Sequence, residues 1–111
     1  MEVKTRQLKR VDVVEVSGRV DSATAPRLEE ALQGILGQGR FHIVVDMQRL
    51  EYLSSAGLRV LVAALKEARR WNRGDVRLAN VSERIKGVLN LAGLDVLFTS
   101  YDTTVDAVGS F

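Results

Sequence analysis

The fold is decided by the stretch Phe41-His42-Ile43-Val44-Val45-Asp46-Met47 and by the two patterns that follow it. This stretch is almost continuously apolar and rich in β-branched residues, which is typical of a central strand covered on both faces. After a loop of about seven residues, a common connection length, apolar side chains recur at helical spacing at Leu58, Leu61, Val62, Leu65 and Ala68. Val76-Arg77-Leu78-Ala79 then has the composition of a further strand. Strand, helix and strand between residues 41 and 79 form a βαβ unit, which predicts two parallel strands joined by a right-handed crossover.

The segments on either side extend this unit into a small α/β domain. Residues 11–16 alternate in part between apolar and polar and predict a strand, with residues 3–8 as an edge strand paired to it. A turn is expected at 18–22 and a last short strand at 96–98. Three further helices are expected, capped by Asp21, Ser22 or Thr24, by Ser82, and by Thr103 or Thr104. The predicted fold is α/β, a single domain over residues 1–111 with a small mixed sheet of about four to five strands and about four α-helices.

The composition excludes several classes of function. The chain has 111 residues, of which 46% are hydrophobic and 27% charged, so it can build one hydrophobic core. The net charge of +2 is poor support for nucleic-acid binding. The absence of cysteine excludes disulfides and thiol catalysis, and the single histidine, His42, argues against a multi-histidine metal site. No apolar leader or membrane-spanning run is recognised, so we expect a cytoplasmic protein with no membrane contact, no metal and no cofactor.

Ser54 and Ser55 stand where the loop after residue 47 meets the strongly apolar helix. A hydroxyl there can cap the helix, which is worth about 1 kcal/mol and is the most common reason for a serine at that place. The positive end of the helix would also accommodate a phosphate on such a hydroxyl, so the site is a candidate charge switch. The sequence shows no nucleophile–base–acid set, no phosphate-cradling loop and no paired carboxylates at an informative spacing, which argues against an enzyme such as a hydrolase.

The order and spacing of several segments make the chain resemble a STAS domain (sulfate transporter and anti-sigma factor antagonist). The resemblance is to the stand-alone anti-sigma factor antagonists and covers nearly the whole chain. It is carried by Val16-Ser17-Gly18-Arg19-Val20-Asp21, by His42-Ile43-Val44-Val45-Asp46-Met47 followed by Leu50, by Ser54-Ser55-Ala56-Gly57-Leu58, and by Leu91-Ala92-Gly93-Leu94.

This resemblance implies a non-enzymatic regulator switched by phosphorylation. In that family the phosphorylated residue lies two positions before the glycine of an Asp-Ser-Ser/Thr-Gly-Leu motif, so Ser55 is the expected site; Ser54, which replaces the aspartate, is the second choice. The unphosphorylated chain would bind an anti-sigma factor that is also a serine protein kinase and would be released when Ser55 is phosphorylated, and a phosphatase would reset it. The ATP would belong to the kinase. The resemblance places the following residues at the partner surface: Asp21, Asp46, Ser54, Ser55, Ala56, Gly57, Leu58 and Arg59.

A phosphate at the mouth of the helix should leave the fold intact and act on the partner surface. Ser55→Asp is therefore expected to abolish partner binding with little change in melting temperature. Ser55→Ala is expected to bind constitutively, at a modest stability cost from a lost cap.

Other interpretations stay open at this stage. Asp21 and Asp46 are equally well explained as a helix cap and a loop cap. The basic ridge of the helix is typical of a solvated face, yet it also suits an acidic partner or nucleic acid; its members are Arg59, Ala63, Lys66, Arg70 and Arg73. A STAS-type scaffold that works without phosphorylation is the main alternative function.

Overall fold

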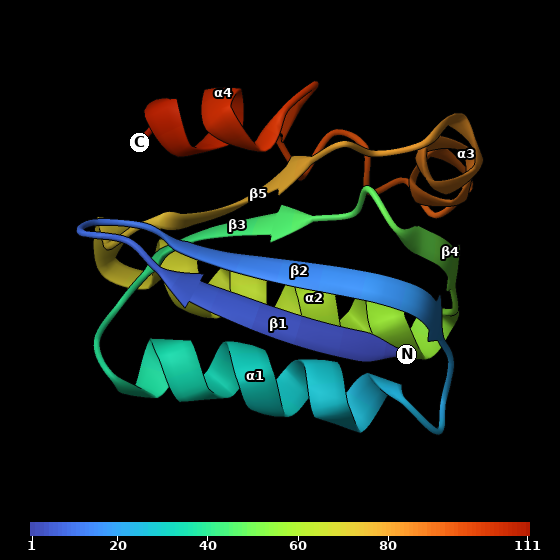
Figure 1. The fold of residues 1–111 in the computed structure, drawn as a ribbon, viewed down its shortest axis with the longest axis horizontal. Coiled ribbons are helices and arrows are strands. Elements are labelled where there is room, and N and C mark those ends of the chain that lie inside the picture. Colours follow the sequence, from blue (N-terminus) through green and yellow to red (C-terminus); the bar gives the residue numbers. More distant parts are fainter.

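The computed structural model describes residues 1–111 as a mixed β-sheet with helices on both faces (Figure 1). The strands are β1 (Glu2–Gln7), β2 (Asp12–Val20), β3 (His42–Asp46), β4 (Leu50–Leu53), β5 (Asp75–Ala79) and β6 (Ser100–Tyr101). The helices are α1 (Ala25–Gly37), α2 (Ser55–Arg69), α3 (Glu83–Leu91) and α4 (Thr104–Gly109), with a short 3₁₀ turn, η1 (Arg70–Asn72), after α2. None of these helices has both the length and the apolar character that crossing a membrane requires.

The strands follow the order β1-β2-β3-β5-β6, and β4 pairs with the end of β2 off this path. β1 runs antiparallel to β2, and every other pairing is parallel. β3 lies between β2 and β5, with Val44 opposite Val13 on one side and Arg77 on the other. The parallel pair predicted for the βαβ unit is confirmed, since β3 and β5 are parallel and α2 lies between them in the chain.

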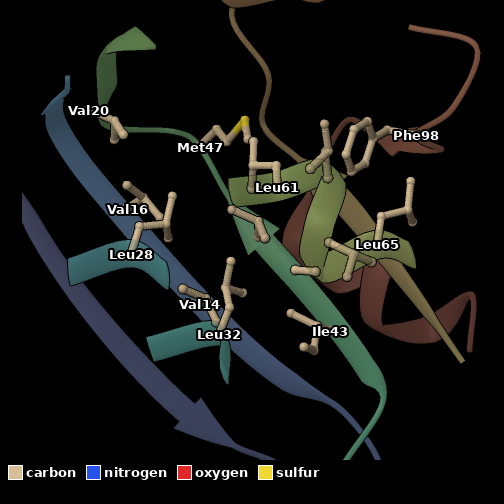
Figure 2. Packing of buried hydrophobic residues seen from close by; sticks show 14 of the residues in the cluster. Val14, Val16, Val20, Leu28, Leu32, Ile43, Met47, Leu61, Leu65 and Phe98 are labelled. Atoms are coloured by element: carbon tan, nitrogen blue, oxygen red, sulfur yellow. The ribbon is translucent and has the colours of Figure 1, made fainter. Parts of the chain in front are cut away.

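Alternate side chains of the central strands belong to two hydrophobic cores, one on each face of the sheet. The larger core has 22 buried residues and lies under α1 and α2. Figure 2 shows Leu28 and Leu32 of α1 close to Val14 and Val16 of β2, with Leu61 and Leu65 of α2 over the same face. The smaller core lies under α4 and consists of Val11, Val13, Val44, Ala79 and Ala107. Because both faces are covered, the central strand is apolar along nearly its whole length.

The prediction of a strand at residues 96–98 is wrong, because the last strand is β6, which spans Ser100–Tyr101. The chain turns instead: the N–H groups of Leu97 and Phe98 both donate to the carbonyl of Leu94, at 3.0 and 3.3 Å. This turn buries Phe98 in the larger core and leaves Val96 83% exposed. Of the apolar residues that favoured a strand here, Phe98 therefore packs into the core and Val96 lies on the surface.

The turn expected at 18–22 begins later, since β2 continues to Val20. Gly18 has φ +81°, a conformation that favours glycine, and the pairing register shifts between Gly18 and Arg19 as in a β-bulge. Beyond this bulge β2 pairs with β4, which lies inside the segment expected to be a loop. The sheet consequently has six strands where about four to five were expected. The predicted class, an α/β fold with a mixed sheet and four α-helices, is confirmed.

Candidate functional site

The two serines at the start of α2 have different roles. Ser54 is the N-cap: its backbone is extended, and its Oγ accepts a hydrogen bond from the N–H of Gly57 at 3.3 Å. Ser55 is the first residue of the helix, its side chain is exposed, and its hydroxyl makes no hydrogen bond within the chain. The expectation that Ser55→Ala removes a cap is therefore wrong, because Ser54 alone caps α2. The Ser55 oxygen is accessible to a partner or a modifying enzyme.

Strand β4 determines where α2 begins. It pairs with β2 through Arg19 opposite Tyr52 and Val20 opposite Leu53, and the N–H of Ser54 then donates to the Val20 carbonyl at 2.8 Å. The N-terminal ends of α1 and α2 consequently lie at the same end of the sheet (Figure 1). The segment that follows β2 thus leads into α1 close to the serines.

Gly57 is a packing residue rather than a surface residue. It is buried, and a Cβ atom at this position would lie 2.6 Å from Leu53 Cδ1 and 2.7 Å from Val20 Cγ1. The absence of a side chain lets the first turn of α2 approach the ends of β2 and β4 closely. Of the residues expected at the partner surface, Gly57 therefore supports the site from beneath.

Ser55 lies in the wall of an open groove of about 540 Å³ beside α2. We call it the Ser55 groove, and its walls are Ser55, Leu58, Arg59, Val62, Ala63, Lys66, Ala92 and Leu94. Five of these eight residues are hydrophobic. Two are basic and none is acidic, so a phosphate with nearly two negative charges would largely cancel the positive charge of the groove.

A second groove, of about 360 Å³, lies between α1 and α2. Its walls are Ser22, Ala25, Pro26, Glu29, Ala56, Arg59, Val60 and Ala63. Arg59 and Ala63 line both grooves and so form the crest between them. The structure therefore brings Ser55, Ala56, Leu58 and Arg59 onto one surface of α2.

Asp21 organises the turn between β2 and α1. Its Oδ1 accepts hydrogen bonds from the N–H groups of Ala23 and Thr24, each at 3.0 Å, and from the Thr24 hydroxyl at 3.1 Å. The hydrogen bonds from Thr24, backbone first and side chain second, hold the pKa of the Asp21 carboxyl below its ordinary value of 3.8. Thr24 occupies the N-cap position of α1 without a side-chain cap bond, so Asp21 is the residue that satisfies these N–H groups. Its place after Val20, whose carbonyl binds Ser54, keeps it at the end of the sheet where α2 begins.

Asp46 lies away from the serines. It pairs with Glu15 across β2 and β3, five residues before Val20, which is about 16 Å along the strand. Its Oδ1 accepts from the N–H of Gln48 at 3.0 Å and from Asn80 Nδ2 at 2.9 Å, and it lines a separate polar crevice of about 390 Å³. Asn80 also donates to the Thr104 hydroxyl at 3.1 Å, so this carboxylate helps to hold the start of α4.

The basic ridge expected along α2 is shorter than the sequence suggested. Arg73 lies beyond the helix, where it pairs with Glu67 at 3.0 Å and stacks over Phe41 at 3.8 Å from the ring centroid. Arg59 and Lys66 remain exposed on the helix. Trp71 is 78% exposed and therefore covers no core.

The remaining chemical candidates are structural. His42 stacks on the ring of Phe111 with centroids 4.8 Å apart. No three or more His, Asp or Glu side chains come close enough to hold a metal ion. The groove walls Ala92 and Leu94 were not assigned to the site from the sequence, although they belong to the Leu91-Ala92-Gly93-Leu94 segment that carries the resemblance.

Comparison with known proteins places this architecture. Residues 2–107 match the STAS domain family. The anti-sigma-B factor antagonist of Staphylococcus aureus is 30% identical over 107 residues, which cover 96% of this chain and 98% of the relative. The crystal structure of an anti-sigma factor antagonist from Mycobacterium paratuberculosis has a TM-score of 0.88 and 28% identity, covering 98% of this chain and 92% of that one. The phosphorylated form of the Bacillus cell fate determinant SpoIIAA shares the fold, with a TM-score of 0.77 over 98% of both chains at 18% identity.

The family assignment follows from the extent of these matches. They span nearly the whole chain and nearly the whole of each relative. Anti-sigma factor antagonists are non-enzymatic regulatory proteins, which agrees with the expectation that the chain is not an enzyme. The chain belongs to the STAS domain family and, within it, to the anti-sigma factor antagonists.

Proposed function

We propose that this chain binds an anti-sigma factor through the surface around Ser55, and that phosphorylation of Ser55 releases the partner. The observation that carries the proposal is that the two adjacent serines have different structural roles. The Ser54 Oγ accepts the hydrogen bond that caps α2. Ser55 is instead exposed, its hydroxyl makes no hydrogen bond, and it lines a groove. A modification of Ser55 therefore acts on the surface without breaking an internal bond.

Relatives of the chain support the choice of partner. The Staphylococcus aureus relative is named as an antagonist of an anti-sigma-B factor, and 30% identity over nearly the full length makes the same class of partner the first choice here. The SpoIIAA protein, which shares the fold, is known in a phosphorylated form. The partner would be an anti-sigma factor with serine kinase activity, and a phosphatase would restore the unmodified chain in the cytoplasm.

The position of Ser55 explains why a phosphate would leave the fold intact. The residue opens α2, where the first N–H groups have no helical partner and the helix dipole is positive. The first turn holds no acidic residue that would repel the phosphate. The effect must then appear at the partner, through repulsion, bulk and desolvation.

Ser55→Asp tests the charge part of the switch. The variant should lose binding to the anti-sigma factor while its melting temperature stays within a few degrees of the native chain, because the new carboxylate lies at a helix N-terminus. Affinity and thermal unfolding are measured on the same preparations. Normal binding by Ser55→Asp, or its failure to fold, would contradict the proposal.

The partner and the modification can be tested together by affinity capture in the native host. The tagged chain is recovered, co-purifying proteins are identified by mass spectrometry, and ATP is then added to the captured complex. We expect to capture an anti-sigma factor, and we expect it to leave the complex while Ser55 becomes phosphorylated. The Ser54→Ala variant should still be phosphorylated, and the Ser55→Ala variant should stay bound to the partner.

Each other outcome of the capture points to a different function. Phosphorylation of Ser54 alone would move the switch to the neighbouring serine. Stable binding of the anti-sigma factor without any phosphopeptide would support a STAS-type scaffold instead.

A further inference from the structure

The Ser55 groove carries two basic side chains that have no acidic side chain within ion-pair distance. Arg59 and Lys66 line it and form no ion pair. The basic residues that follow on the same stretch of chain are paired: Arg69 lies 2.8 Å from Asp75, and Arg70 lies 4.0 Å from Glu67. With no acidic residue in its walls, the groove is electrostatically complementary to an acidic partner.

The floor of the same groove is apolar and periodic. Leu58 and Val62 are spaced by four residues on α2, about one helical turn, and both are only partly buried. Side chains repeating at one-turn intervals form a ridge of the kind that packs against the ridge of a second helix.

The opposite wall adds apolar surface: Leu94 packs partly against the larger core and leaves part of its side chain exposed. Ala92 and Leu94 line the groove, and the same segment carries Leu91 and Val96, which are 93% and 83% exposed. Exposed apolar patches that are rimmed by polar residues mark protein interaction sites. The groove thus combines an apolar floor with a basic rim.

From this combination we infer that the Ser55 groove receives an amphipathic helix of the anti-sigma factor whose polar face is acidic. Its apolar side chains would enter between Leu58, Val62 and Leu94, and its carboxylates would meet Arg59 and Lys66. Helix-in-groove recognition uses anchors at this spacing. The inference rests on the proposed function, because it specifies which part of the partner the site takes.

The inference also explains how one phosphate could expel the partner. Ser55 belongs to the wall of the groove, so its phosphate would stand beside the acidic helix and cancel the charge of the two basic residues. A basic helix would instead be held more tightly after phosphorylation. The sign of the effect is therefore diagnostic of the charge of the occupant.

A synthetic peptide pair tests the occupant. One peptide of about 15 residues, about 22 Å as a helix, carries leucine on one face and glutamate on the other, and its twin carries lysine in place of glutamate. Titration of the isotopically labelled full chain, followed by NMR, should shift Leu58, Val62, Lys66 and Leu94 with the glutamate peptide. Ser55→Glu should weaken the glutamate peptide and not the lysine peptide.

Charge reversal in the chain supplies the matched control. The double variant Arg59→Glu, Lys66→Glu should bind both the glutamate peptide and the purified anti-sigma factor at least about tenfold more weakly. Lys9→Glu, an exposed residue between β1 and β2, reverses a charge outside the groove and should bind both as the native chain does. Melting temperatures confirm that all variants are folded.

The outcomes separate this inference from the function it refines. If the native chain binds the anti-sigma factor and the double variant binds it equally well, the inference fails and the proposed function stands. If no anti-sigma factor binds the native chain, the proposed function fails. Equal binding of the two peptides, or shifts of the same residues when the chain alone is concentrated, would assign the groove to another occupant and overturn the inference.

Discussion

Two adjacent serines show how much one position along the backbone matters. Ser54 and Ser55 have the same side chain, yet only Ser54 accepts the hydrogen bond from Gly57 N–H. The motif identifies both hydroxyls but not which one the helix uses, because a shift of one residue in the start of the helix exchanges their roles. The structure assigns the structural role to Ser54 and leaves Ser55 available.

Removing each hydroxyl should separate these roles in a stability measurement. Ser54→Ala should lower the free energy of unfolding by about 1 kcal/mol, because a Gly57 N–H loses its acceptor. Ser55→Ala should change it by no more than about 0.5 kcal/mol. Urea unfolding of both variants provides the comparison. A larger loss for Ser55→Ala than for Ser54→Ala would contradict the assignment of the cap.

Even a methyl side chain at position 57 should destabilise the protein. Gly57→Ala places a methyl group 2.6 Å from Leu53 Cδ1 and should cost about 1–3 kcal/mol through overpacking. Gly34→Ala, within α1 and with nothing inside 4 Å, is the control and should stabilise the protein by about 0.5–1 kcal/mol. Thermal unfolding measures both, and similar effects at the two glycines would argue against close packing at the start of α2.

Asp21 should make the stability of the chain depend on pH. Its pKa is lower in the folded than in the unfolded state, so the unfolded chain binds more protons in acid and the stabilisation is lost as pH falls. The advantage of the native chain over Asp21→Asn should be full above pH 3.8 and shrink as pH falls below it. Unfolding free energies measured across this range would refute the assignment if the difference between the two proteins did not change with pH.

At the scale of the elements, one side chain joins three parts of the fold. Arg40, in the connection between α1 and β3, pairs with Asp12 at the start of β2 and donates to the Leu8 carbonyl in the β1–β2 turn at 2.7 Å. The side chain of Asp12 is only 5% exposed, so its carboxylate depends on this guanidinium. The pair thus fixes the end of the sheet opposite the candidate site.

Loss of Arg40 should therefore be costly. Arg40→Met leaves the buried Asp12 carboxylate unpaired and should destabilise the chain by about 3 kcal/mol. Arg6→Met breaks the exposed pair with Glu15, whose side chains are 55% and 40% exposed, and should cost less than about 1 kcal/mol. Chemical denaturation compares the two, and an equal cost would show that the Asp12 pair is not buried in solution.

Elements with a strong local pattern were predictable, and elements made by distant pairing were not. The run around Val44 and the helical spacing of Leu61 and Leu65 are local signals, and both led to correct elements. β4 has little local signal, because its pairing with Val20 requires the bulge at Gly18. Likewise, Phe98 lies in a turn rather than in a strand, because its ring packs into the larger core.

The candidate site divides in the same way. Ser55, Leu58 and Arg59 lie on one helix, so the motif places them together on one surface. Ala92 and Leu94 reach the groove only through the packing of α3 and the turn after it, which no local spacing reveals. Asp46 is close to the motif in sequence but lies elsewhere, because its strand ends beside Glu15 rather than beside Val20.

For the molecule as a whole, the sheet is a scaffold closed on both faces. Helices α1 and α2 cover one face and α4 covers the other, so the central strands are buried on both faces (Figures 1 and 2). Ser55 lies outside both cores. The molecule is accordingly suited to carry a change of surface charge without a change of fold.

The most direct test of this account is the affinity of the anti-sigma factor for the chain before and after phosphorylation of Ser55, measured by calorimetry on one preparation whose melting temperature is also recorded. We expect phosphorylation to weaken binding by about 100-fold or more, about 2.7 kcal/mol, while the melting temperature is unchanged or slightly higher. Equal affinity of the two forms, or a weaker affinity accompanied by loss of the folded state, would contradict the central claim.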